Sequence, residues 1–267
     1  MFLFFTLLLY NFSMVKKKGI SEQEIVDMVK KTNAMRFLSA FNNIDFTIKT
    51  RYNLSRSTGF SEAVRRCVAF NFVIRKYEDD LISFGRLRNA IIHDNGETII
   101  AEPHTEVVEK IEKIERLLTA PPKALDSVAR RDVLMVSASK SMREVIKLIA
   151  SSSYSNLPVF NKDGEIIGIA NGQKILDSFG KFLIAGGKAD SFLDSVKIED
   201  MLSKIESSNY YAFANKDITI EQALSLFHQN SKLLAILITE NGGAREKPLG
   251  IMTGSDVLKM NKIIEKF

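Results

Sequence analysis

Residues 141–160 (SMREVIKLIASSSYSNLPVF) and residues 219–238 (TIEQALSLFHQNSKLLAILI) share one pattern, and this pattern decides the fold. Each stretch begins with a hydroxyl residue suited to cap a helix, Ser141 or Thr219, and continues with an apolar face at i, i+3, i+4 and i+7 spacing. Each then ends in a short apolar run, which is typical of a buried strand. Because the two stretches lie 78 residues apart throughout, the chain contains an internal repeat.

The repeat continues beyond these two stretches. The turn at Asp163-Gly164 corresponds to Asn241-Gly242, and a four-residue insertion within 243–247 then moves the offset to 82. With this offset, Gly168-Ile169 corresponds to Gly250-Ile251. Each unit is therefore predicted to contain, in order, a strand, a helix, a strand, a hairpin turn, a strand and a helix. Two such β-α-β-β-α units are expected to pack their sheets face to face, since neither unit buries its apolar face alone.

The second unit ends in a motif that carries chemistry. Residues 250–256 (GIMTGSD) stand where the last strand gives way to the last helix. Within this repeat, the motif resembles the G-h-x-[ST]-x-x-D signature of tandem CBS (cystathionine-β-synthase) domains. The resemblance implies a CBS pair over residues 120–262, with its units at about 122–180 and 195–262. The expected fold class is α+β, with an N-terminal all-α helical domain followed by this pair.

The resemblance implies that the motif holds an adenosyl ligand such as AMP, ADP, ATP or S-adenosylmethionine. Thr253 can offer a hydroxyl to a phosphate at the positive end of a helix, and Asp256 can accept hydrogen bonds from ribose hydroxyls. Four further residues are expected to form an apolar slot for the adenine: Tyr211, Ala212, Ala235 and Ile236. The residue types of Thr253 and Asp256 also suit a simple helix cap, so capping without a ligand is the alternative interpretation.

The first unit departs from the motif. Its equivalent stretch has Asn171 in place of the Ser or Thr and Lys174 in place of the Asp. A lysine cannot accept hydrogen bonds from ribose hydroxyls, so one competent site per chain is expected. Lys174 is expected to be a solvated surface residue, with neutralisation of a phosphate at the other site as the alternative.

Residues 19–119 have a helical pattern. Ser21 and Glu24 have the spacing of a capping box, and Pro103 occupies an expected first helical position. Apolar-periodic segments predict further helices at residues 35–52, 61–80, 81–93 and 103–118. The sequence Thr119-Ala120-Pro121-Pro122 ends the last of them and is the only clear domain boundary.

A second motif lies near the end of the fourth helical segment. Residues 88–93 (RNAIIH) have the R-N-x-x-x-H form and resemble the signature of HEPN domains, many of which are metal-independent ribonucleases. The resemblance makes Arg88, Asn89 and His93 candidate catalytic residues at a composite site in which two copies of the motif meet across a dimer. A histidine transfers protons near neutral pH, and an arginine stabilises the charge of a scissile phosphate. If the segment is helical, Asn89 lies on the face of His93.

The charge balance bears on this hypothesis. Residues 30–88 contain 12 basic and five acidic residues, a balance that suits an RNA backbone, whereas the whole chain has a net charge of +5. The alternative is structural: the arginine pairs with an acidic neighbour at Glu78, Asp79 or Asp80, and His93 only ends a helix. The sequence therefore leaves open whether the helical domain is an enzyme.

Composition and the absence of common motifs exclude several further classes of protein. Cys67 is the single cysteine and there are three scattered histidines, so neither an intrachain disulfide nor a metal site is predicted. No P-loop, no GxGxxG after a strand and no nucleophile elbow is present. Residues 1–18 begin with an apolar run of ten residues, shorter than a membrane span and not organised as a secretory signal. We expect this leader to be disordered or to arise from a mis-assigned start before Met14; a membrane anchor is the alternative.

These observations predict a cytoplasmic, homodimeric regulator without a stable membrane partner. An adenine nucleotide or related ligand binds the CBS pair and controls the HEPN-like domain, with no other cofactor. Two alternatives remain. The first is a nucleotide-gated endoribonuclease with RNA as its partner, and the second is a structural dimerisation module without a ligand.

Overall fold

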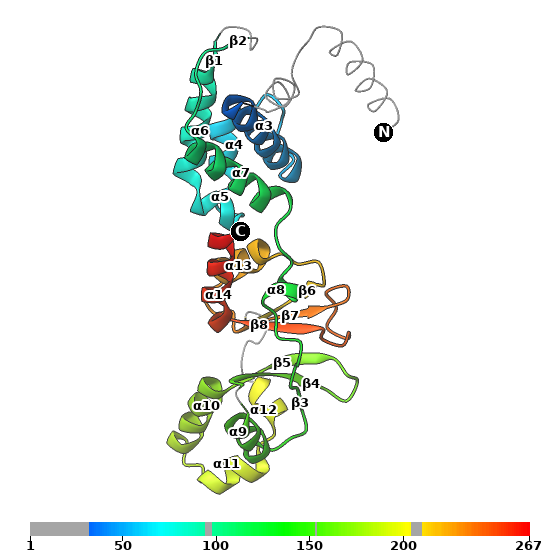
Figure 1. Cartoon of the computed structure of the whole chain (residues 1–267). Helices are drawn as coiled ribbons and strands as arrows, with labels where there is room; N and C mark the ends of the chain where they lie inside the picture. The colour runs from blue at the N-terminus through cyan, green and yellow to red at the C-terminus, as the bar shows by residue number, and fades with distance from the viewer. Residues whose placement is uncertain (1–31, 94–97, 153, 204–209) are drawn as a thin grey trace, which may run out of the picture. The chain divides into compact units, whose positions relative to one another are not determined.

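The computed structural model describes residues 32–93, 98–152, 154–203 and 210–267 (Figure 1). The predictions for the leader and for the Ser21 capping box lie outside these residues. The chain divides into two compact units. The helical unit contains residues 32–63 and 79–115, and the CBS-like unit contains residues 64–78 and 116–267.

The helical unit is built around aromatic side chains on amphipathic helices. Its elements are α3 (Asn33–Arg51), the first half of α4 (Phe60–Cys67), α6 (Glu78–Ile91), β1 (Ile92–His93), β2 (Thr98–Ile99) and most of α7 (Thr105–Thr119). The rings of Phe37 and Phe84 meet edge to face with centroids 5.7 Å apart. Arg36 Nη2 lies 2.7 Å from Glu112 Oε2, which ties α3 to α7. These contacts confirm a helical N-terminal region.

Three helix boundaries differ from the prediction. The helix predicted over 61–80 is wrong, since the chain breaks after α4 and restarts as α5 (Phe72–Lys76), where Asn71 Oδ1 accepts from Ile74 N at 2.9 Å. The helix predicted to reach His93 ends at Ile91, because the next two residues pair with β2 instead. Pro103 stands two residues before α7 rather than at its first position. In each case a local backbone pairing or cap decides the boundary.

The CBS-like unit confirms the predicted repeat. Its first half contains β3 (Val136–Ser137), α9 (Met142–Ser151), β4 (Asn156–Phe160), β5 (Ile166–Asn171) and α10 (Gly172–Ile184). Its second half contains β6 (Tyr211–Asn215), α13 (Ile220–Gln229), β7 (Ala235–Thr239), β8 (Gly250–Thr253), the 3-10 turn η3 (Gly254–Asp256) and α14 (Val257–Lys266). In each half the first two strands are parallel and the last two antiparallel.

The two sheets pack against each other, as predicted. An apolar cluster joins them through Ile166 and Ile169 of β5 and Ala235, Leu237 and Ile251 of β7 and β8. Two short helices that precede the first strand of each half were not predicted: α8 (Ala124–Ser127) and α12 (Ile198–Leu202). A further helix, α11 (Ala189–Ser195), packs on α9.

The segments that lead into each half cross over to the other half. Before β3, Arg130 pairs with Ile251 of β8, with Arg130 N donating to Ile251 O at 3.0 Å and Ile251 N to Arg130 O at 2.9 Å. Before β6, Leu202 of α12 packs over β5 at Gly168, where an added Cβ would lie 2.8 Å from Leu202 Cδ1. The glycine is therefore needed for this close approach. The crossing places residues of the first half beside the motif of the second.

Residues 64–78, which the prediction assigns to a helical domain of residues 19–119, pack instead with the CBS-like unit. Helix α5 lies against α13 (Figure 1). Phe72 N at the start of α5 donates to Ser225 Oγ at 3.0 Å and to Glu221 Oε1 at 3.3 Å. Both acceptors are buried, at 5% and 3% exposed. At the other end of α5, Lys76 Nζ lies 3.1 Å from Glu265 Oε1 of α14.

Candidate functional site

The motif residues meet where β8 ends and α14 begins. Asp256 Oδ2 accepts from Thr253 N at 2.8 Å and from Thr253 Oγ1 at 3.1 Å. Thr253 Oγ1 also lies 2.7 Å from Ser255 Oγ. The carboxylate thus fixes the turn that starts the helix, which is the structural role that the residue types allow.

Counting hydrogens shows what this network leaves for a ligand. The one hydroxyl hydrogen of Thr253 points to Asp256 Oδ2, so Ser255 is the donor in its contact with Thr253. Asp256 Oδ2 has both lone pairs in use, whereas Oδ1 can accept hydrogen bonds from vicinal hydroxyls. A ligand oxygen needs only a rotation of the Ser255 or Thr253 hydroxyl to receive a donor.

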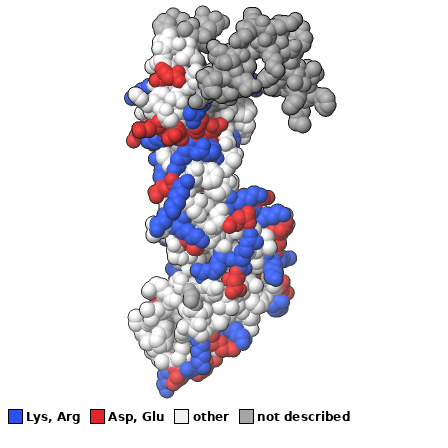
Figure 2. Space-filling view, viewed as in Figure 1, with Lys and Arg blue, Asp and Glu red and all other residues white. Residues whose placement is uncertain are grey.

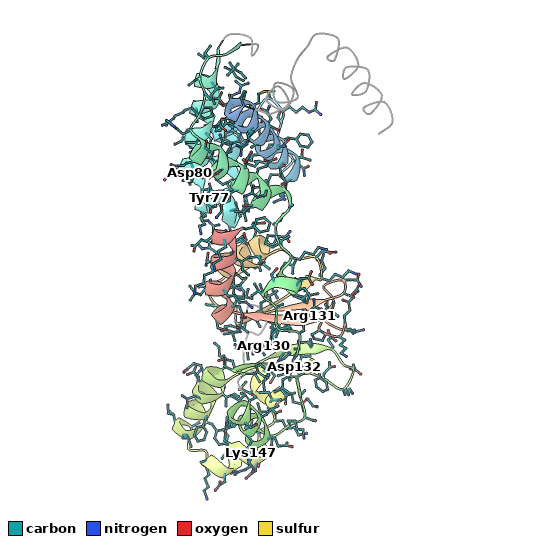
Figure 3. All side chains as sticks on the ribbon, viewed as in Figure 1. Tyr77, Asp80, Arg130, Arg131, Asp132 and Lys147 are labelled. Carbon is teal, nitrogen blue, oxygen red and sulfur yellow. The ribbon has the colours of Figure 1, made fainter. Side chains whose placement is uncertain are left out.

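These residues line a narrow cleft that encloses about 450 Å³ with its open mouth included. The second half contributes the ends of β8 and η3, and the first half contributes the segments before β3 and β4. The lining residues are Arg130, Asp132, Val133, Leu134, Tyr154, Ser155, Asn156, Ile251, Thr253, Ser255 and Asp256 (Figure 3). The lining is mostly polar, with Val133, Leu134 and Ile251 as its aliphatic residues, so the cleft offers a ligand several hydrogen-bonding groups.

A stacked pair stands on the first-half side of this cleft. The Arg130 guanidinium carbon lies 4.5 Å from the centroid of the Tyr154 ring, a cation–π contact. Asp132 lines the same cleft and is exposed to solvent. Within the residues that the structure describes, neither Arg130 nor Asp132 forms an ion pair. The cleft therefore presents one cation together with the carboxylates of Asp132 and Asp256.

The structure brings together only part of the predicted set. Thr253 and Asp256 line the cleft, but the four residues predicted to hold the adenine, Tyr211, Ala212, Ala235 and Ile236, are not among its lining residues. Ala235 is paired in the sheet with Thr253 on one side and Tyr211 on the other, and its side chain is fully buried. Burial, with the nearby Glu165 carboxylate, raises the pKa of Tyr211.

The lining residues that the sequence analysis missed come from the first half. Arg130 and Tyr154 stand outside the motif, and the crossing of the lead-in segment brings Arg130 to it. No local sequence pattern marks either residue as part of the site, because both are distant from residues 250–256 along the chain.

The equivalent strand end in the first half, at the end of β5, lies beside a cation–π contact. Lys174 Nζ lies 4.0 Å from the centroid of the Tyr210 ring. Asn171 Oδ1 caps α10 by accepting from Lys174 N at 3.1 Å, and Asn171 Nδ2 donates to Asn156 Oδ1 at 2.8 Å. Lys174 is partly exposed, and its ammonium group contacts the Tyr210 ring, a contact that the sequence analysis did not predict.

The helical unit contains a second, wider cleft of about 910 Å³, again with its mouth included. Arg88 and Asn89, two of the three predicted catalytic residues, line it with Lys49, Asp45 and Arg86. Arg88 Nη1 donates to Asn89 Oδ1 at 3.3 Å. His93 lies beyond the end of α6, so the predicted arrangement of Asn89 and His93 on one helix face is wrong.

Comparison with known proteins bears on the CBS-like unit. Residues 125–180 match the family model of the CBS domain. The chain contains a CBS domain. The match covers the first half, and the second half repeats its strand order and pairing. We refer to the two halves as the first and second CBS units.

One curated relative is UPF0053 protein YrkA of Bacillus subtilis (strain 168), which is 25% identical over 134 residues. The match covers 49% of this chain and 27% of the relative, so the chain spans about a quarter of that protein.

Two solved structures are similar in fold. One is the CBS domain of the bacterial CNNM/CorC family Mg²⁺ transporter in complex with ATP, with 16% identity, 57% of this chain and 94% of that chain covered, and a TM-score of 0.42. The other is CBSX2 in complex with AMP, with 19% identity, 54% and 98% covered, and a TM-score of 0.39. Among the described residues of our chain, no helix is both long enough and apolar enough to cross a membrane.

Proposed function

We propose that the CBS pair binds one adenine nucleotide or related adenosyl ligand per chain, in the cleft that ends at Thr253 and Asp256, and that binding controls the helical domain. The observation that carries this proposal is the cleft itself, where a carboxylate, two hydroxyls and a helix start converge on a space lined by both CBS units. Such a regulator acts in the cytoplasm, as the single buried cysteine suits a reducing compartment.

Different residues of the cleft bind different parts of the ligand. Asp256 Oδ1 accepts from the ribose hydroxyls, and the hydroxyl of Ser255 or Thr253 turns to a phosphate oxygen. The phosphate then lies near the start of α14, where backbone N–H groups and the helix dipole favour negative charge. The equivalent position in the first CBS unit holds Lys174 against Tyr210, which supports one site per chain.

Helix α14 supports the regulatory part of the proposal. Its first turn adjoins the ligand cleft, and Glu265 near its other end pairs with Lys76 beside α5. Residues 64–78 thus rest on the same two helices, α13 and α14, that follow the strands of the second CBS unit. A ligand can change the packing of residues 64–78 on these helices only to the extent that it binds one packing arrangement more tightly than another.

Thermal unfolding of the full chain tests this proposal. Each of AMP, ADP, ATP and S-adenosylmethionine is added separately, and the unfolding midpoint is recorded. A ligand that binds only the folded state stabilises it by about 2.7 kcal/mol at a concentration 100 times its Kd. We expect at least one of the four to raise the midpoint. No change with any of them would contradict the proposal and leave the structural dimerisation module.

One observation favours a second candidate function for the helical unit, that of a HEPN-type endoribonuclease acting as a dimer. Arg88 and Asn89 line an open cleft with Arg86, so two arginines are available to an RNA phosphate, while Lys49 in the same cleft pairs with Asp45 at 2.8 Å. On the face of the helical unit that Figure 2 shows, acidic side chains lie among the basic ones, so the positive charge of that face is not one continuous patch.

His93→Ala tests this second candidate. We expect the variant to lose RNA cleavage while keeping the dimer by light scattering and nucleotide binding by calorimetry. Cleavage that persists in the variant, or a wild-type protein that is monomeric at micromolar concentration, would contradict a composite site formed by two copies of the motif.

A further inference from the structure

The cation–π pair of Arg130 and Tyr154 at the cleft indicates which class of ligand the site prefers. We propose that Arg130, held on the ring of Tyr154, binds a phosphate of the ligand, so that the site selects phosphorylated adenine nucleotides over uncharged or cationic adenosyl compounds. This inference rests on the proposed function and adds to it the residue that determines specificity.

The backbone fixes Arg130 beside the motif. Two main-chain hydrogen bonds join it to Ile251, at 3.0 and 2.9 Å. Ile251 and Thr253 are two residues apart in β8, so their side chains lie on the same face of the strand. Arg130 therefore stands beside the strand end that carries the hydroxyls of Thr253 and Ser255, and all three residues line the cleft.

The side chain of Arg130 is arranged to receive an anion. Its guanidinium lies 4.5 Å from the Tyr154 ring centroid, and no carboxylate among the described residues pairs with it. Stacking on a ring limits the rotamers of the side chain but leaves its N–H groups free to donate. A planar guanidinium binds phosphate in a bidentate manner, which an ammonium group cannot do.

A competing group lies in the same cleft. Asp132 could pair with the ammonium and sulfonium charges of S-adenosylmethionine, and it would repel a phosphate placed beside it. Both residues are exposed, but Asp132 has no ring contact or ion pair to orient it among the described residues, whereas the Arg130 guanidinium lies on the Tyr154 ring. The preorganised group is the cation, and this favours the phosphorylated ligand.

Calorimetric titration of the full chain with AMP, adenosine and S-adenosylmethionine tests the inference. We expect AMP to bind at least about tenfold more tightly than adenosine, because a hydrogen bond to a charged group contributes about 1.5–3 kcal/mol. Arg130→Ala is expected to lower the affinity for AMP to that of adenosine and to leave the affinity for adenosine unchanged. Unchanged adenosine binding also shows that the variant is folded.

Two further variants sharpen the test. Arg131→Ala is the matched control, since Arg131 has the same charge one residue away but pairs with Asp126 at 2.7 Å and does not line the cleft. It is expected to bind AMP as the wild type does. Arg130→Lys keeps the charge and loses the planar stack, so we expect affinity for AMP between those of the wild type and Arg130→Ala.

The outcomes separate the two proposals. Equal affinity for AMP and adenosine in the wild type, or AMP affinity unchanged in Arg130→Ala, would overturn the role of Arg130 and leave nucleotide binding intact. Tighter binding of S-adenosylmethionine than of AMP would overturn it in favour of Asp132. A wild-type protein that binds none of the three compounds would overturn both proposals.

Discussion

The two CBS units have the same order of elements and the same strand pairing, yet they use equivalent positions for different purposes. At the end of the third strand, the second unit has Thr253 and Asp256 facing a cleft, whereas the first has Asn171 and Lys174, with the lysine held on Tyr210. The sheet tolerates both sets because the residues at a strand end do not contribute to the core. Equivalent strand ends thus present a carboxylate and two hydroxyls in the second unit and a lysine on an aromatic ring in the first.

The first helices of the two units, α13 and α9, also differ at equivalent positions, here in how much of the side chain is exposed. Leu224 on α13 is 2% exposed, while Ile146, its equivalent on α9, is 36% exposed. Three positions before Leu224 and Ile146, each helix has a residue that contacts an added helix. On α13, the buried Glu221 accepts from the first N–H of α5. On α9, Arg143 forms an exposed ion pair with Asp194 of α11. The second unit is therefore integrated with the rest of the chain through buried contacts.

The largest effect is expected from a matched pair of core truncations. Leu224→Ala removes a buried side chain and should lower the free energy of unfolding by about 2–5 kcal/mol. Ile146→Ala removes an equivalent side chain that water already reaches, so its effect should be well below that range. Urea unfolding of the full chain measures both variants. Equal losses would show that the two helix faces are covered to the same degree.

A smaller loss of stability is expected three positions earlier on each helix. Glu221→Ala removes one of the two acceptors for Phe72 N and leaves Ser225 without its carboxylate partner, at a cost of about 1–3 kcal/mol. Arg143→Ala is the control, because exposed ion pairs contribute little to stability. The same unfolding measurement compares the two. A larger effect of Arg143→Ala would contradict the importance of the α5 contact.

The comparison of the two strand ends predicts a difference in ligand affinity. Asp256→Ala should weaken nucleotide binding at least about tenfold, since it removes the acceptor for the ribose hydroxyls. Lys174→Ala should change the affinity little, because Lys174 lies at the other strand end. Calorimetry with AMP measures both. If Asp256→Ala bound as tightly as the wild type, the site would lie elsewhere.

The smallest effect concerns the turns between the last two strands. In the first unit, the neutral amide of Asn161 accepts from the backbone N–H groups of Asp163 and Glu165. In the second, the longer loop uses Glu246, whose carboxylate accepts from Asn241 N at 2.7 Å and Gly243 N at 3.3 Å. These donors, together with the side chains of Asn241 and Thr239, lower the pKa of Glu246 from 4.5 to about 2.

The sign of the pH dependence follows from this shift. A carboxylate with a folded-state pKa below its unfolded value contributes its full stability above about pH 4.5 and loses it as the pH falls through about 2. Glu246→Gln should therefore destabilise the protein most above pH 4.5 and progressively less toward pH 2. Unfolding measured at pH 6 and pH 3 checks this. A difference between wild type and variant that grows toward low pH would reverse the assignment.

What the sequence could predict depended on how far apart the interacting residues are. The repeat, its turns and the position of Thr253 and Asp256 follow from patterns within a few residues, and the structure has all of them. Arg130 and Tyr154 were missed because the lead-in segment crosses to the other unit, which no local pattern shows. The break in the helix predicted over 61–80 has a local cap at Asn71, but the start of α5 is also held by acceptors about 150 residues away, Glu221 and Ser225, which no local pattern shows.

The packing of residues 64–78 on α13 also bears on how the protein can be divided. Proteolysis at the Thr119–Pro122 boundary would release a C-terminal fragment without α5, although both CBS units would be intact in sequence. That fragment would lose the Phe72 N–H that donates to the buried side chains of Glu221 and Ser225, and it would be less stable than the full chain. A stable C-terminal fragment therefore needs residues 64–78 as well as residues 116–267, and a recombination that exchanges only the CBS pair would separate α13 from the segment that packs on it.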